Sequence, residues 1–128
     1  MSNSDPGPNL NINITAITHH SDGTYTGTYA YASGPGGPKI VHPNGDIDLS
    51  GQMTAVDIAW TIVVEGYSFR DKGFTATAVQ QFGIPSIDST KNTCSVDDLN
   101  EQAKWEYILY LKDSNGHHIK LDPKVINR

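Results

Sequence analysis

Two residues near the C-terminus, Asp122 and Pro123, form the dipeptide whose reactivity is clearest from the sequence. The Asp side-chain carboxylate can attack its own backbone carbonyl and form a cyclic anhydride, with the carboxylate as the nucleophile. The leaving group is the secondary nitrogen of proline, which departs once it is protonated. Water then opens the anhydride and completes hydrolysis, whereas an amine opens it to form an isopeptide bond. The dipeptide therefore predicts self-cleavage, provided that the fold supplies a proton donor or a base that activates water.

The same dipeptide occurs a second time, as Asp5-Pro6, which offers a comparison within the chain. Residues 1–8 are polar and rich in proline and glycine, so we expect a disordered tail there and a single domain over residues 9–128. Asp-Pro is common in turns and is a weak signal by itself. Cleavage after Asp122 but not after Asp5 would therefore mean that the folded environment drives the reaction.

Two predicted strands, residues 105–112 and 117–121, determine what surrounds Asp122. Their apolar side chains occupy odd-numbered positions, which is typical of half-buried strands. Paired residues share a face of the sheet only when their numbers have matching parity, so a two-residue Asn115-Gly116 loop is excluded. A three-residue loop with Gly116 in the left-handed conformation restores the match. The predicted pairs are Asp113 with His117, Leu111 with Ile119, and Leu109 with Leu121.

The even-numbered residues of this hairpin form its opposite face. Asp122 is expected opposite Ile108 and diagonal to Glu106. Lys104 lies four positions beyond Ile108, about 13 Å along the strand. A solvated face with scattered charges explains the same pattern without any chemistry.

Residues 104–113, the turn that follows and residues 120–128 resemble the end of the small bacterial β-sandwich proteins of the DP-EP family. The specific part is Asp-Pro followed by a Val-Ile-Asn-Arg tail, in register with a strand that contains a lysine. Residues 56–69 are also similar in character, so the resemblance covers roughly residues 45–128. It implies self-cleavage at Asp122-Pro123, linkage of the new Asp carboxyl to Lys104, and self-assembly. The Glu-Pro dipeptide of the family name has no counterpart in this chain.

The resemblance does not identify the residue that activates water, and two carboxylates are candidates. Asp57 lies inside the apolar run of residues 56–65, and the hairpin geometry points to Glu106. A buried carboxylate has a raised pKa and can act as a general acid or base. Without such a role, Asp57 is a polar-face residue of a strand and Glu106 is a surface ion-pair partner of Lys104.

The linkage to Lys104 meets a distance problem, because a lysine side chain does not span the separation from Asp122 in a flat hairpin. Three solutions remain open. The chain bends after Leu121, or the linked pair forms by rearrangement, or the lysine comes from another molecule.

The remaining pattern predicts an all-β fold, an antiparallel β-sandwich of immunoglobulin-like or cupredoxin-like type with at most one short helical turn. Residues 95–101 are expected to form that turn, capped by Ser95, and residues 80–94 to be irregular. Strands are predicted at residues 10–14, 24–31, 39–41, 46–49, 56–65, 67–70, 74–79, 105–112 and 117–121.

Composition narrows the function classes. The 128 residues carry a formal charge of −5 and only nine scattered Lys and Arg residues, which argues against nucleic-acid binding. No apolar run approaches the roughly 18 residues of a membrane span. The first residues lack the pattern of a signal peptide, so we expect a cytoplasmic protein, with secretion by another route left open.

Metal and cofactor chemistry is not expected. The single cysteine, Cys94, excludes an internal disulfide framework and a cysteine-based zinc site. It also has no histidine within twenty residues, which makes a copper electron carrier a weak third hypothesis. Adjacent histidines on a strand, as in His19-His20 and His117-His118, point to opposite faces and rarely supply two ligands.

The sequence therefore predicts an autocatalytic, aspartic-type peptidase that acts on its own Asp122-Pro123 bond, with no cofactor and with copies of itself as partners in a homo-oligomer. The alternative is a non-catalytic, self-assembling structural or ligand-binding β-sandwich, in which Asp-Pro is an ordinary turn.

Overall fold

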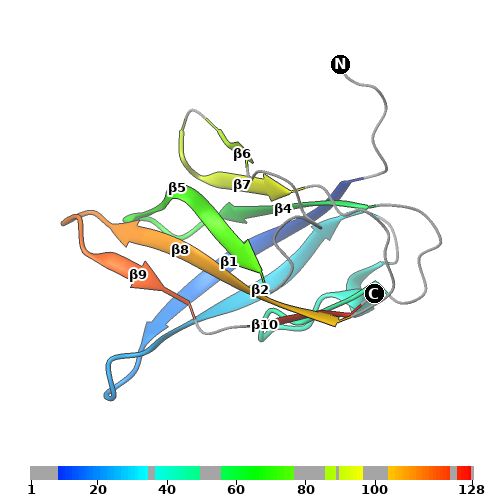
Figure 1. Ribbon diagram of the computed structural model, residues 1–128, viewed down its shortest axis with the longest axis horizontal. Helices are drawn as coiled ribbons and strands as arrows, with labels where there is room; N and C mark the ends of the chain where they lie inside the picture. Colours follow the sequence, from blue (N-terminus) through cyan, green and yellow to red (C-terminus); the bar gives the residue numbers. More distant parts are fainter. Residues whose placement is uncertain are drawn as a thin grey trace.

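The computed structural model describes residues 9–34, 37–49, 56–76, 86–88, 90–96, 104–121 and 124–127. At residues 71, 72, 104 and 127 it describes the backbone but not the side chain. Within these ranges the chain forms two five-stranded sheets that pack on each other (Figure 1). No helix in the described part of the chain is long and apolar enough to cross a bilayer.

Neighbouring strands in each sheet are often not consecutive in the chain. The first sheet has the order β2 (Tyr25–Ser33), β1 (Asn9–His19), β4 (Asp57–Ile62), β7 (Thr93–Val96), β6 (Ser86–Ile87). The second has the order β3 (Ile47–Asp48), β10 (Lys124–Asn127), β8 (Lys104–Asp113), β5 (Tyr67–Ala76), and β9 (His118–Lys120) also pairs with β8.

Alternating side chains create the core between the sheets. Every second residue of β4 is buried, and so are the odd-numbered residues of β8 from Trp105 to Leu111. Trp60 of the first sheet packs against Phe74 and Tyr107 of the second, with ring centroids 5.5 Å and 5.1 Å away. Such offset aromatic contacts bury a large apolar area and join the two layers.

The predicted β-sandwich is confirmed, but its sheets are mixed. Each sheet combines antiparallel ladders with one parallel pair: β1 runs parallel to β4, and β10 runs parallel to β3. Parallel neighbours need a long crossover connection. Here each of these connections includes at least one strand of the other sheet. The sequence pattern showed alternation but not which strands pair.

The predicted hairpin register is also confirmed. Leu111 pairs with Ile119, and Leu121 donates its backbone N–H to the carbonyl of Leu109 at 3.1 Å. The loop contains three residues and ends at Gly116, whose φ of 82° is in the left-handed region that glycine adopts without strain.

Local predictions are wrong in several places. Ser95 does not cap a helical turn; it lies in β7, where its buried neighbours Cys94 and Val96 face the core and the strand pairs with β4. Burial of alternate residues outweighed the capping signal. The one 3-10 turn among the described residues is Pro38–Ile40, where a strand was expected, and Pro38 fixes the backbone angle that begins it.

Other predictions fall on residues outside the described ranges. These are the tail at residues 1–8 with its Asp5-Pro6 comparison, the rest of the predicted helical turn at 97–101, and residues 80–85 and 89 of the segment expected to be irregular. The described part of that segment differs from the prediction, because residues 86–87 form β6 and residues 93–94 begin β7, where they pair with each other and with β4.

Candidate functional site

Asp122 and Pro123 lie outside the described residues, but the residues on both sides of them are described. Leu121 lies opposite Leu109 of β8, and Lys124 lies opposite Tyr107 of the same strand. One residue separates the two positions on β8, whereas two residues separate Leu121 from Lys124. The register with β8 therefore differs by one residue between the two flanks of the dipeptide.

The strand that follows the dipeptide, β10, is held on both sides. It runs antiparallel to β8 and parallel to β3, so Ile126 lies between Trp105 and Ile47. The Ile126 side chain is fully buried in the core. The C-terminal segment is thus an inner strand of the second sheet rather than a loose end.

Asp46 contacts this segment directly. Its Oδ1 accepts a hydrogen bond at 3.0 Å from the backbone N–H of Val125, in a partly buried position. Its other oxygen, Oδ2, accepts a hydrogen bond from the Asn44 side chain, and Asn44 Oδ1 in turn accepts the Asp46 backbone N–H. The turn thus orients a carboxylate toward the residue two places after Pro123.

Sequence reasoning did not single out Asp46. Its signal was the sequence Pro43-Asn44-Gly45, which predicts a turn because these residue types favour turns. A turn signal says nothing about a partner 79 positions further along the chain, and only the folded structure brings Val125 to it.

Tyr107 links the same turn to β8. Its hydroxyl donates a hydrogen bond to the carbonyl of Gly45, and its side chain is buried. Burial, reinforced by the nearby Tyr29 and Asp46, raises the pKa of Tyr107 well above its ordinary value. The phenol therefore remains protonated at neutral pH and serves as a hydrogen-bond donor rather than as a base.

Gly45 shows how tightly this region is packed. Its φ is 104°, and a Cβ atom there would lie 2.6 Å from the Tyr29 ring and 3.0 Å from Cγ of Lys124. The distance to the ring is shorter than real Cβ atoms show in proteins, so a side chain at this position would force the ring or the turn to move. The turn therefore rests directly on Tyr29 and on the first residue of β10.

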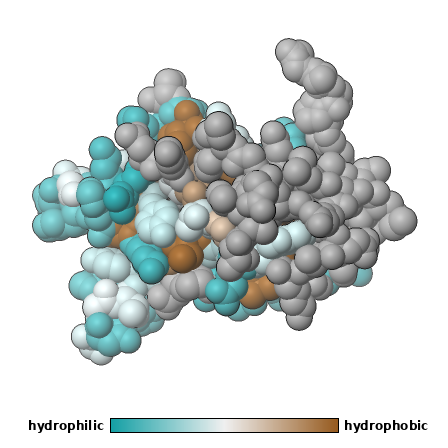
Figure 2. Space-filling view, viewed as in Figure 1, coloured by the Kyte–Doolittle hydropathy of each residue, from teal (hydrophilic) through white to brown (hydrophobic). Residues whose placement is uncertain are grey.

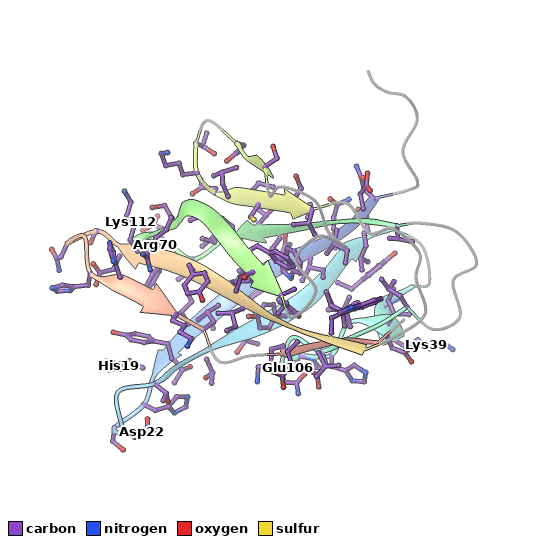
Figure 3. The ribbon with its side chains drawn as sticks, in the orientation of Figure 1. His19, Asp22, Lys39, Arg70, Glu106 and Lys112 are labelled. Carbon is purple, nitrogen blue, oxygen red and sulfur yellow. The ribbon has the colours of Figure 1, made fainter. Side chains whose placement is uncertain are left out.

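The predicted site residues are divided between the sheets. Glu106 lies on β8 opposite Val125, with an exposed side chain (Figure 3). The backbone of Lys104 lies opposite Asn127 on the same pair of strands. Asp57 opens β4 in the first sheet and belongs to the half-buried positions that alternate with the core residues. The structure thus brings Glu106 and Lys104 onto the strand beside the dipeptide's flanks and places Asp57 on the other sheet.

The histidines considered as metal ligands have other neighbours. His19 stacks on Tyr25 at 4.3 Å, and His20 shares a hydrogen bond with Thr26. His117 pairs with Asp113 through Nδ1 at 3.1 Å. Among the described residues, no group of three or more His, Cys, Asp or Glu side chains could hold a metal ion.

Comparison with models of known protein families and with curated proteins finds no match for this chain. The resemblance to the DP-EP family therefore remains a prediction from the C-terminal motif.

Proposed function

We propose that this protein cleaves its own Asp122-Pro123 bond and is, in that sense, a single-turnover enzyme whose substrate is its own chain. The observation that supports this most is the pinning of both flanks of the dipeptide on one strand with a register change of one residue. Fixed flanks reduce the conformations open to the bond between them. Holding reacting groups near one another is a large source of rate enhancement in intramolecular reactions.

In the proposed reaction, a side-chain oxygen of Asp122 attacks the Asp122 carbonyl carbon and forms a five-membered anhydride. The C–N bond to Pro123 breaks, and the nitrogen leaves as a secondary amine after it has taken up a proton from the Asp122 carboxyl or from a neighbouring acid. Water then adds to the anhydride. The products are a chain that ends in Asp122 with two carboxyl groups and a six-residue peptide that begins with Pro123.

Asp46 is the described carboxylate that best fits a supporting role. By accepting the Val125 N–H, it holds the leaving segment two residues from the bond that breaks. We assign it as a positioning residue, because its oxygens bond to the backbone of Val125 and to the side chain of Asn44. Glu106, opposite Val125 on β8, remains the candidate for activating water, and Asp57 is disfavoured because it lies on the other sheet.

Linkage to Lys104 is the second possible outcome of the anhydride. The ζ-amine of the lysine would replace water, form an amide with Asp122 and lose one proton. Lys104 lies opposite Asn127, three positions beyond Tyr107 on β8 and so roughly 10 Å from the start of β10. The isopeptide therefore requires a bend, a rearrangement or a lysine from a second copy.

Cleavage would leave β10 in its sheet, held by β3 and β8 and by the buried Ile126. A strand that is no longer covalently attached can be exchanged with the same strand of another copy. This supports self-assembly as part of the proposal.

Mass spectrometry of the intact chain, denatured after long incubation under native conditions, tests the proposal. We expect loss of the peptide 123–128 in the wild type and full mass in Asp122→Ala. Asp5→Ala is the matched control and should be cleaved like the wild type. A product one water lighter than the hydrolysed chain, which disappears in Lys104→Arg, would identify the isopeptide.

A wild-type chain that keeps its full mass would overturn the proposal. The protein would then be a non-catalytic, self-assembling structural or ligand-binding β-sandwich, and Asp122-Pro123 would have no chemical role.

A further inference from the structure

A pocket of about 280 Å³ lies at the end of the second sheet where β5, β8 and β9 come together. Among the described residues that line it, four are basic: Arg70, Lys91, Lys112 and His118. Figure 3 shows Arg70 and Lys112 near each other at this end of the molecule, and Figure 2 shows hydrophilic residues gathered over the same end. Phe69 lines it as well.

The strand registers explain why three of these side chains share a face. Lys112 of β8 pairs with Ser68 of β5 on one side and with His118 of β9 on the other. Arg70 follows two residues after Ser68, so it points to the same side of the sheet. The alternate residues, which include Phe69 and Leu111, are buried toward the core.

Lys91 reaches the pocket from the other sheet. Its carbonyl accepts the backbone N–H of Phe69 at 2.8 Å, which fastens the turn before β7 to β5. Lys91 has a φ of 61°, in the left-handed region that is costly for a lysine. The Asp88 carboxylate holds this turn by accepting the backbone N–H groups of Asn92 and Thr93. The fold thus keeps a lysine at the pocket in a strained conformation.

Two described carboxylates near the pocket, Asp88 and Asp113, are bound elsewhere. Asp88 is hydrogen-bonded within its own turn, and Asp113 is bonded to the backbone of Asn115 and His117 and paired with the His117 ring. Among the described residues, no carboxylate forms an ion pair with any of the four basic residues of the pocket.

The guanidinium of Arg70 is oriented before any ligand arrives. It lies 5.6 Å from the centroid of the Tyr110 ring, a cation–π contact with a residue of β8. This contact holds the charge of Arg70 beside β8, on the side of the sheet that carries Lys112.

The like charges of these side chains repel one another at short range, and a bound anion would relieve that repulsion. Lysine and arginine side chains that converge in a small pocket match the several oxygen acceptors of a phosphate group. We propose that this pocket binds a phosphate group, carried either by a phosphate monoester of a small molecule or by inorganic phosphate. The assignment is independent of the proposed self-cleavage.

Binding is tested by calorimetry and by NMR titration of the wild-type chain with inorganic phosphate and with phenyl phosphate. We expect saturable binding that weakens as salt is added, with the largest shifts at the backbone amides of Lys91, Lys112 and His118. Tighter binding of phenyl phosphate assigns the site to monoesters, and tighter binding of inorganic phosphate assigns it to the free ion.

Charge-matched variants test whether the pocket itself is responsible. Lys112→Gln and Arg70→Gln should each weaken binding by about tenfold, because each removes a charge-assisted contact. Lys39→Gln removes the same charge from an exposed lysine on the 3-10 turn, far from the pocket in Figure 3, and should bind like the wild type. Thermal unfolding of each variant confirms that it is folded.

Two results would overturn the proposal. One is the absence of saturable binding for both probes. The other is an equal loss of affinity in Lys39→Gln and Lys112→Gln, which would mean that the anions respond to overall charge rather than to this pocket.

Discussion

The backbone N–H of Val125 donates a hydrogen bond to the Asp46 carboxylate at 3.0 Å, and the two residues are 79 positions apart in the chain. This contact attaches the start of β10 to the turn before β3. It also places a carboxylate beside the segment that follows the Asp-Pro dipeptide. The stability of the C-terminal strand and the proposed cleavage therefore depend on the same turn.

Replacement of Asp46 tests that relationship. Asp46→Ala should lower the free energy of unfolding by about 1–2 kcal/mol, because the Val125 N–H loses a charged acceptor in a partly buried place. It should also slow cleavage. Asp46→Asn keeps an oxygen acceptor and should retain most of the stability. Chemical denaturation and intact-mass time courses measure the two effects, and an alanine variant as stable as the wild type would contradict the assignment.

Ile126 tests how firmly the C-terminal strand is held. Ile126→Ala should cost about 2–4 kcal/mol, because it leaves a cavity in the core between the sheets. In cleaved protein the same change should release the peptide 123–128, which size-exclusion chromatography followed by mass spectrometry would detect. Val125→Ala, at a half-buried neighbouring position, is the control and should have a smaller effect. Equal losses in the two variants would mean that side-chain burial does not retain β10.

Alanine substitutions at Gly45 and Gly116 distinguish the cost of backbone strain from the cost of steric overlap. Both have positive φ angles, so alanine costs roughly 1–2 kcal/mol at either position through the left-handed conformation alone. At Gly116 nothing lies within 4 Å of the added Cβ atom, whereas at Gly45 the Tyr29 ring lies at 2.6 Å. Thermal unfolding should therefore show a clearly larger loss for Gly45→Ala. Similar melting temperatures for the two variants would show that the turn moves away from Tyr29 without cost.

The burial of Cys94 predicts that its thiol reacts slowly at mildly alkaline pH. Burial raises the pKa of its thiol from the ordinary value of 9.0 to about 12. Since the thiolate is the reactive form, native protein at pH 8 should react very slowly with iodoacetamide, and unfolded protein at the same pH should react quickly. Rapid labelling of the native chain would contradict the burial of this residue.

The same pKa shift affects stability. The folded pKa lies above the unfolded one, so the contribution of the neutral thiol is fully present below about pH 9 and is lost as pH rises toward 12. Cys94→Ala should reduce the slope of stability against pH in this range. Part of the slope should remain, because burial also raises the pKa of Tyr107. Denaturation curves across this range, with the wild type alongside, measure the difference.

Some features of the fold could be predicted because they depend on residues close together in the chain. Alternation in β8 identified its buried face, and parity with Ile119 and Leu121 determined the register and the three-residue loop that ends at Gly116. Both follow from the two-residue period of a strand and the short reach of a hairpin.

Local signals failed where a distant partner outweighed them. Ser95 carries a capping signal, yet it lies in a strand because Cys94 and Val96 are buried against the core and pair with β4. Propensity contributes a few tenths of a kilocalorie per residue, whereas burial of an apolar side chain contributes more.

The expected reactivity of the C-terminal dipeptide and the β-sandwich class could be predicted from the sequence, because a dipeptide and an alternating pattern are local properties. The hydrogen bond from Val125 to Asp46, the insertion of β10 between β3 and β8, and the gathering of Arg70, Lys91 and Lys112 at one pocket arose on folding. Each joins segments far apart in the chain. Their meeting depends on which strands become neighbours in a sheet, and a strand's own residues specify its faces but not its neighbours.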